Sequence, residues 1–178
     1  KSIPASKATK KPVAKKPVTK VAKKAAPPEK KKEAKPEKKE RSINLKYADK
    51  SAGQPEMFDI FEAIKKLMLP YDKKRELVMH TGTGGQANLV THKPVVIAGR
   101  PRKELWFVSA LVQKGYVGFY YMPIYMNDPM KKQFSPEFIK CLQGKACFHI
   151  KKNDPAIMAE IKKAIQIGYA AYEKRGWL

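Results

Sequence analysis

The chain has 178 residues, with 38 Lys and Arg against 16 Asp and Glu, and a formal net charge of +22. This length has room for one ordinary domain and an appendage, but not for two independent hydrophobic cores. No apolar run approaches the about 20 residues of a membrane-spanning helix, and two cysteines are too few for a secreted disulfide framework, so we expect a cytoplasmic protein with reduced thiols.

The first 41 residues differ in composition from the rest. They contain 16 Lys and Arg against four Glu, a net charge of +12, together with six prolines and no aromatic residue. Such a segment cannot bury enough apolar surface to offset its loss of chain entropy. The sequence therefore predicts a disordered basic tail over residues 1–41 and a folded domain over residues 42–178.

Lysine density of this kind favours binding to nucleic-acid phosphates, because counterion release needs no fold and no base specificity. The candidate contacts are ten tail lysines: Lys10, Lys11, Lys15, Lys16, Lys20, Lys23, Lys24, Lys30, Lys31 and Lys32. The alternative is a solubilising tail without a specific partner. If the partner is DNA, association with the nucleoid follows.

The folded part is predicted to begin with two helices. Residues 56–69 show helical periodicity after Pro55, with Met57, Ile60 and Ile64 on the apolar face. A shorter helix is expected over residues 72–79, before the glycine-rich segment Thr81–Gly85. That segment could cradle a phosphate through its backbone N–H groups, but it lacks the Gly-Lys-Ser/Thr ending of a P-loop, so we favour a mobile loop.

Three strands are predicted next, over residues 94–98, 104–112 and 116–126. The segment Gln113-Lys114-Gly115 fits a three-residue hairpin loop that pairs Val112 with Tyr116. This register places one set of side chains on each face of the hairpin. The first set is Leu105, Phe107, Leu111, Val117, Phe119 and Tyr121; the second is Trp106, Val108, Ala110, Tyr120 and Met122.

A helix over residues 136–142, a strand over 146–151 and a last helix from Pro155 complete the predicted elements. The expected fold class is α+β, with an antiparallel sheet of about four strands packed with helices. Because both hairpin faces are apolar, the second needs a cover: another helix, a second subunit in a homodimer, or a ligand. Trp106, Tyr120 and Met122 are therefore candidate ligand or interface residues.

Cys147 and His149 alternate onto one face of the predicted strand over 146–151, a spacing that could supply two metal ligands. Further ligands would have to come from His80, His92 or Cys141, which stand at no recognisable spacing. We favour a packed thiol and an edge histidine.

Three segments carry a family resemblance. They are Lys93-Pro94-Val95-Val96, Tyr120-Tyr121-Met122-Pro123 and Gly144-Lys145-Ala146-Cys147-Phe148-His149-Ile150-Lys151, the last leading into an amphipathic helix. With the order of elements, they make residues 57–177 resemble the YdhG-like family, a domain of unknown function. The resemblance implies an α/β sandwich with an antiparallel sheet. Some relatives are described as frataxin-like bacterial iron chaperones with an acidic ridge on the first helix, where the matching positions here are Glu56, Asp59 and Glu62.

The sequence thus favours a non-enzymatic, cofactor-free YdhG-like domain tethered to nucleic acid or another polyanion by its tail. Two alternatives stay open. One is an intracellular iron chaperone that uses the first-helix carboxylates, and the other is a small-ligand or enzymatic site on the Trp106 face of the sheet.

Overall fold

The structure is a computed structural model, and it describes residues 48–73, 76–82 and 84–178. The predicted basic tail, its ten candidate lysines and the expected domain boundary after residue 41 lie outside the described residues.

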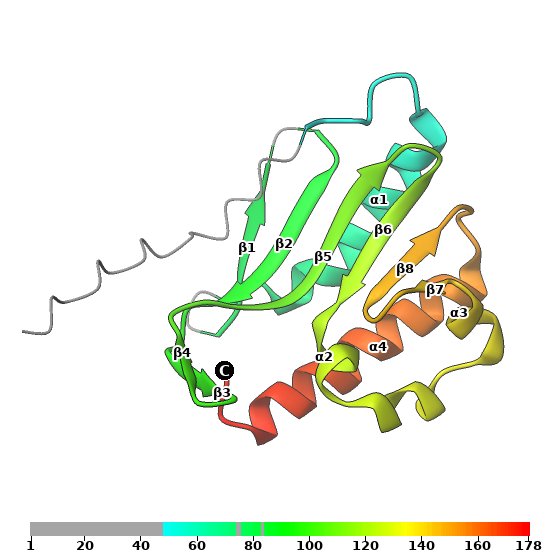
Figure 1. Ribbon diagram of the computed structural model, residues 1–178. Helices are drawn as coiled ribbons and strands as arrows, with labels where there is room; N and C mark the ends of the chain where they lie inside the picture. Colours follow the sequence, from blue (N-terminus) through cyan, green and yellow to red (C-terminus); the bar gives the residue numbers. More distant parts are fainter. Residues whose placement is uncertain (1–47, 74–75, 83) are drawn as a thin grey trace, which may run out of the picture. The chain divides into compact units, whose positions relative to one another are not determined.

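Two antiparallel sheets form the β-structure (Figure 1). The larger has six strands in the order β1-β2-β5-β6-β8-β7. Its strands are β1 (Val78–Thr81), β2 (Gln86–Thr91), β5 (Leu105–Gln113), β6 (Tyr116–Tyr121), β7 (Leu142–Gln143) and β8 (Cys147–Ile150). The smaller sheet is a hairpin of β3 (Val95–Ile97) and β4 (Arg100–Arg102). The expected α+β class with an antiparallel sheet is confirmed, with more strands than the four we expected.

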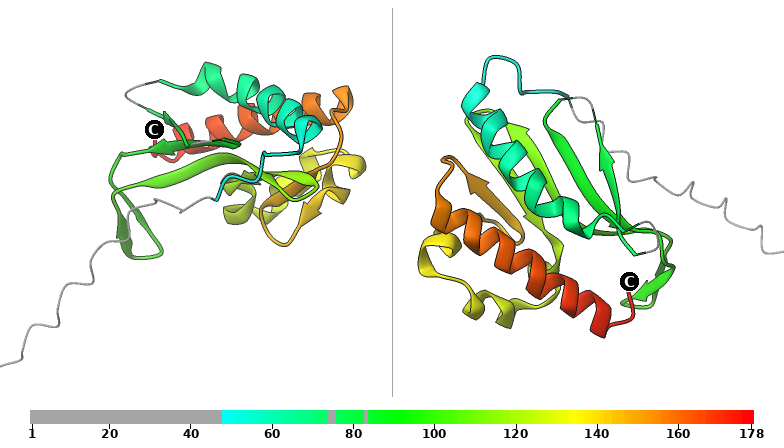
Figure 2. Two further views of the ribbon diagram at one scale, coloured as in Figure 1. Left: turned by 90° about the horizontal axis from the view of Figure 1, so that it is seen from above. Right: turned by 180° about the vertical axis from the view of Figure 1, so that it is seen from behind.

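Two long helices, α1 (Pro55–Met68) and α4 (Pro155–Lys174), cover one face of the six-stranded sheet (Figure 2). The predicted apolar face of α1 is buried, with Ile64 and Met68 fully inaccessible. Asp154 caps α4 because its carboxylate accepts hydrogen bonds from the first backbone N–H groups of the helix. Both helices begin with a proline, whose missing N–H would have no partner there in any case.

The core lies between these helices and the sheet, and it is rich in aromatic rings. Phe138 stacks on Phe148 with ring centroids 4.2 Å apart, and Phe107 meets Tyr172 of α4 at 5.0 Å. Tyr121 is fully buried and its hydroxyl contacts the Met130 sulfur at 3.2 Å. Burial raises the pKa of the Tyr121 and Tyr172 hydroxyls, so both are neutral at physiological pH.

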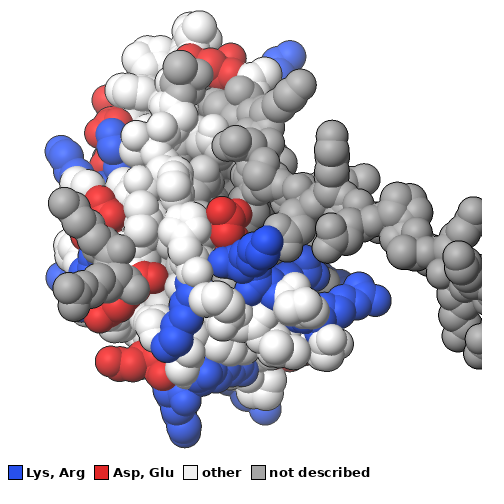
Figure 3. Space-filling model, turned by 90° about the vertical axis from the view of Figure 1, so that its left-hand side faces the viewer, with Lys and Arg blue, Asp and Glu red and all other residues white. Residues whose placement is uncertain are grey.

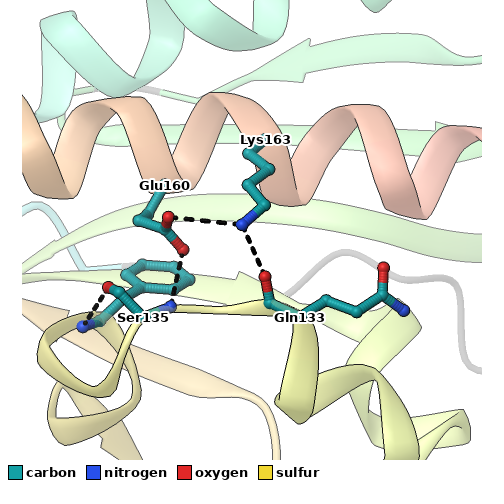
Figure 4. A network of polar contacts seen from close by, with 5 residues as sticks. Gln133, Ser135, Glu160 and Lys163 are labelled. Carbon is teal, nitrogen blue, oxygen red and sulfur yellow. Dashed lines mark hydrogen bonds and ion pairs between the residues drawn. The ribbon is translucent and has the colours of Figure 1, made fainter.

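A run of short helices connects β6 to β7. It consists of α2 (Met122–Met126), η2 (Asp128–Gln133) and α3 (Pro136–Lys140), while η1 (Leu69–Tyr71) follows α1. A polar network holds this run against α4 (Figure 4): Glu160 accepts from the Ser135 N–H at 3.1 Å, and Lys163 donates to the Gln133 carbonyl at 2.6 Å. Ser135 also caps α3, because its hydroxyl accepts a hydrogen bond from the Phe138 N–H.

The predicted helix over residues 72–79 is wrong. Instead, the Asp72 carboxylate accepts a hydrogen bond from the Met79 N–H at 2.9 Å, and Lys73 forms an antiparallel bridge with Leu77. Strand β1 follows, and it pairs with β2 in a register that sets Val78 opposite Val90. The glycine-rich segment is therefore the connection between two strands rather than between a helix and the sheet.

The predicted register of the β5–β6 hairpin is off by one residue. Gln113 pairs with Tyr116 and Val112 with Val117, so the turn consists of Lys114 and Gly115, with Gly115 at φ 79°. A one-residue slip exchanges the faces of one strand relative to the other.

A β-bulge opposite Leu89 and Val90 then leaves Phe107 unpaired. As a result Phe107 and Val108, which the prediction put on different faces, are both fully buried. Ala110 shares their helix-covered face, because it pairs directly with Phe119.

Candidate functional site

The sheet face opposite α1 and α4 carries a continuous row of polar side chains. Directly paired residues share a face of an antiparallel sheet, and one such line of pairs crosses all six strands. It comprises His80, Asn88, Ser109, Tyr120, Cys147 and Gln143, in the order β1-β2-β5-β6-β8-β7, and is called the polar row below.

The structure brings two of the three predicted face residues together. Tyr120 belongs to the polar row, and Trp106 lies on the same face because it pairs with Val90 beyond the bulge. Met122 does not join them, since β6 ends at Tyr121 and Met122 is the first residue of α2. Trp106 and Tyr120 are half-buried, whereas Asn88 and Ser109 are buried.

Three buried polar atoms on this face have no hydrogen-bond partner within residues 48–73, 76–82 and 84–178: Asn88 Oδ1, Ser109 Oγ and Trp106 Nε1. Buried polar atoms in native proteins are nearly always hydrogen-bonded, and an unsatisfied one costs about 1–3 kcal/mol. The face therefore offers two acceptors and two donors that no group of the described residues engages. The sequence signal that could have found them is the small or polar residue at position 88 and at position 109, each inside an otherwise apolar strand.

Tyr120 and Cys147 form a hydrogen-bonded pair within the polar row. Burial, together with the neighbouring thiol, raises the pKa of Tyr120 to about 12. Burial also raises the pKa of the Cys147 thiol, and the hydrogen bond with Tyr120 only partly opposes it. Both groups are thus neutral near pH 7. They can exchange hydrogen bonds, but neither is poised as a nucleophile, because the thiolate is the reactive form.

Aromatic rings enclose this pair. The Tyr120 ring lies over Gly118, where an added Cβ would come within 2.9 Å of the ring. Beside it Tyr116 stacks on His149, with centroids 3.8 Å apart and planes at 17°. Burial, with a smaller effect of Lys151, lowers the pKa of His149, which favours the neutral imidazole.

Cys147 and His149 share one face of β8, as the alternation predicted, but the other candidate metal ligands do not gather around them. His80 and His92 lie at the far side of the sheet, with facing Nε2 atoms 3.2 Å apart. Cys141 accepts the His149 backbone N–H through its carbonyl, and its thiol contacts the Glu137 carbonyl. In the part of the chain that the structure describes, no three His, Cys, Asp or Glu side chains are arranged to hold a metal ion.

The acidic ridge lies on α1, as predicted. Glu56 and Asp59 are exposed, and Glu62 is half-buried in an ion pair with Lys65 at 3.0 Å. An acid early in a helix and a lysine one turn later complement the helix dipole. The ion pair with Lys65 therefore engages Glu62, one of the three carboxylates that match the acidic ridge of the iron chaperones.

At the glycine-rich segment a carboxylate of the chain itself takes the place of an anion. Asp49 accepts hydrogen bonds from the Ser51 hydroxyl, the Ser51 N–H and the Gly85 N–H, which hold the pKa of this carboxyl below its ordinary value. A Cβ at Gly84 would overlap the Asp49 carboxylate, at 2.1 Å. The Gly85 N–H is therefore already engaged and is not free to bind a phosphate.

A pocket of about 530 Å³ lies beside β8, between the end of α3 and the start of α4. Its lining includes Cys141, His149, Lys140, Lys151 and Asp154. Together with Lys152, its charged lining is three lysines against one aspartate, so the pocket carries a net positive charge.

The β3–β4 hairpin, with Arg100 and Arg102, forms a basic surface. Sequence reasoning took residues 94–98 as an ordinary strand and missed the partner strand Arg100–Arg102. The signal was the Ala98-Gly99 dipeptide between two short extended segments. Figure 3 views the side of the molecule that carries β1 and this hairpin, and it shows Lys and Arg gathered on its lower half.

Comparison with known proteins gave no match: no family model fits the sequence, and no curated protein or solved structure is significantly similar to it. The resemblance to the YdhG-like family therefore stays a prediction. Among the described residues, no helix is long and apolar enough to cross a membrane.

Proposed function

We propose that this protein associates with nucleic acid through its lysine-rich N-terminal segment, while the α+β domain has a non-enzymatic binding or structural role. The observation that carries the proposal is the distribution of charge. Residues 1–41 have a net charge of +12, and residues 42–178, with 22 basic and 12 acidic groups, add +10. The positive charge is thus concentrated at one end of the chain without being balanced by the other.

The expected interaction is electrostatic. If about eight of the ten candidate lysines contact phosphates, the logarithm of the binding constant falls with the logarithm of salt concentration with a slope of about −7 on duplex DNA. The segment has no aromatic residue to stack on bases, so we expect no preference for single strands and no base specificity from it.

The chemistry of the polar row supports the non-enzymatic part of the proposal. Its thiol and phenol are both held in their neutral forms. A nucleophile or a general base at neutral pH would need a lowered pKa or an adjacent base. Hydrogen bonding is the chemistry that these groups can offer.

The test is a salt titration of duplex DNA binding by two full-length proteins. One is the wild type, and the other has the ten candidate tail lysines replaced by Gln, which keeps the length of the chain and removes ten charges. The expected result is a much shallower salt slope and weaker binding for the variant. Equal affinity of the two proteins over the titration would overturn the proposal.

A further inference from the structure

The β3–β4 hairpin extends from one end of the six-stranded sheet as a separate ribbon (Figure 1). The last residue pair of β2 and β5 is Thr91 with Leu105, so the chain leaves the sheet after Thr91 and returns to it at Leu105. Residues 92–104 are therefore one excursion whose middle is the ribbon.

The turn, an ion pair at the base and one buried side chain fix the position of the ribbon. Its turn is Ala98-Gly99, with φ angles of 50° and 72°, the pair of positive values that a tight two-residue hairpin turn requires. At its base His92 Nδ1 lies 3.4 Å from a carboxylate oxygen of Glu104. A ribbon of three residue pairs is not stable by itself, and burial of Val95 attaches it to the core.

The two arginines of β4 share one face of the ribbon with its aliphatic residues, because Arg102 pairs with Val95 and Arg100 with Ile97. Val95 is buried and Ile97 is half-buried, whereas both arginines are exposed to solvent. Within the described part of the chain neither arginine has an acidic partner. Keeping two such charges adjacent and unpaired has no evident benefit for folding.

The other side of the ribbon is apolar and exposed. Val96 has 68% of its surface accessible, and it pairs directly with the exposed Pro101. The ribbon thus has cations on one side and a small hydrophobic pair on the other. Lys93 and Lys103 flank it, so residues 92–104 contain four basic residues and one acid.

We propose that the β3–β4 hairpin is a second nucleic-acid contact, which enters the major groove of duplex DNA with Arg100 and Arg102 against the phosphates. This inference rests on the proposed function of the lysine-rich segment. The major groove of B-form DNA is about 12 Å wide and admits a two-stranded β-ribbon. Arginine is the side chain best suited to phosphate recognition, and apolar side chains in the groove contact thymine methyl groups.

The geometry selects duplex DNA over duplex RNA. The major groove of an A-form RNA helix is deep and too narrow for side chains to reach. A flexible lysine-rich segment, in contrast, binds either backbone, because it needs only phosphate charge. The hairpin therefore supplies the preference for DNA that the N-terminal segment cannot.

The experiment compares full-length variants on a DNA duplex and on an RNA duplex of matched sequence. The hairpin variant is Arg100→Ala/Arg102→Ala. Its control, Lys114→Ala/Lys152→Ala, removes the same charge from the β5–β6 turn and from the segment after β8, at the other end of the sheet (Figure 1). A third variant, Arg100→Lys/Arg102→Lys, keeps the charge, and thermal unfolding confirms that every variant is folded.

The salt slope on DNA should become about two units less negative for the hairpin variant, since each lost phosphate contact removes about 0.9. The control should leave the slope unchanged, and the Lys variant should keep it. A hairpin variant that behaves like the control, or that loses as much on RNA as on DNA, would overturn the inference. The protein with ten tail lysines replaced by Gln decides the proposed function separately, because its hairpin is intact.

Discussion

The two faces of the six-stranded sheet differ in polarity. The face under α1 and α4 is dry and aromatic, and rings such as Phe119 and Phe148 are fully buried there. The opposite face carries the polar row, with buried polar atoms that have no hydrogen-bond partner in the described part of the chain. A sheet needs only one apolar face to fold. The first face therefore accounts for stability, and the second is the one that selection could adapt to binding.

The sharpest way to break this comparison is to substitute one aromatic residue on each face. Phe148→Ala should lower the free energy of unfolding by about 3–5 kcal/mol, because it leaves a cavity beside Phe138. Tyr120→Phe keeps its ring and loses only the hydrogen bond with Cys147, so it should cost under about 1.5 kcal/mol. Urea denaturation of both variants gives the two values, and equal losses would contradict the assignment of stability to the helix-covered face.

Close packing under α4 gives the next largest effect. Gly168 lies so near β6 and α2 that an added Cβ would stand 2.7 Å from the Tyr121 hydroxyl and 2.8 Å from Pro123. Gly168→Ala should destabilise the protein by about 1–3 kcal/mol through overpacking, although alanine is the better helix former. Thermal unfolding measures it beside Ala170→Gly, an exposed site of α4 where propensity alone should cost about 1 kcal/mol. A Gly168→Ala protein more stable than wild type would refute the close contact.

On the face with the polar row, we expect a substitution that does not lower the stability of the protein. Ser109→Ala removes a buried hydroxyl that has no hydrogen-bond partner among the described residues, so it should leave stability unchanged or raise it by up to about 1 kcal/mol. Ser135→Ala is the matched control, because that hydroxyl caps α3 and its loss should cost about 1 kcal/mol. The order of the two chemical denaturation midpoints decides the matter.

The smallest effect is one of pH, and it reports on the Tyr120–Cys147 pair. Burial raises the pKa of Cys147 in the folded protein. The stabilisation from its protonated thiol is therefore complete below the ordinary thiol pKa of about 8.5, and it is lost as the pH rises through the higher pKa of the folded state. In a Cys141→Ser background, alkylation of Cys147 should be slow at pH 8 and accelerate only at higher pH. Tyr120→Phe should slow it further at a given pH, because the hydrogen bond lowers the thiol pKa. Faster alkylation in that variant would contradict the pairing.

Periodicity and punctuation predicted the elements with strong local signals. Helix α1 follows from its apolar spacing after Pro55, and α4 from Pro155 in its first turn. The segment over 72–79 failed because its helical pattern was short, and the side-chain bond from Asp72 to the Met79 N–H favours a turn. The sequence did not predict strand β2, because the glycines just before it favour a loop.

The candidate site depended on information that is not local. The polar row exists only because six strands align in one register, and the exchange of Lys114-Gly115 for a three-residue loop was enough to misplace Val108 and Ala110. The bulge beside Leu89 then brought Trp106 back to the face of Tyr120. The lysine-rich segment needed no such information, since charge density is readable residue by residue.

The ends of the sheet have a consequence for the behaviour of the protein at high concentration. Among the described strands, the outermost are β1 with four residues and β7 with only two. A strand at the edge presents unpaired backbone groups that can recruit an edge from another molecule, and a short edge offers few of them. The ribbon carries a comparable safeguard in Pro101, which has no N–H to donate. At high concentration the short edges and Pro101 thereby hinder the joining of neighbouring molecules into a continuous sheet.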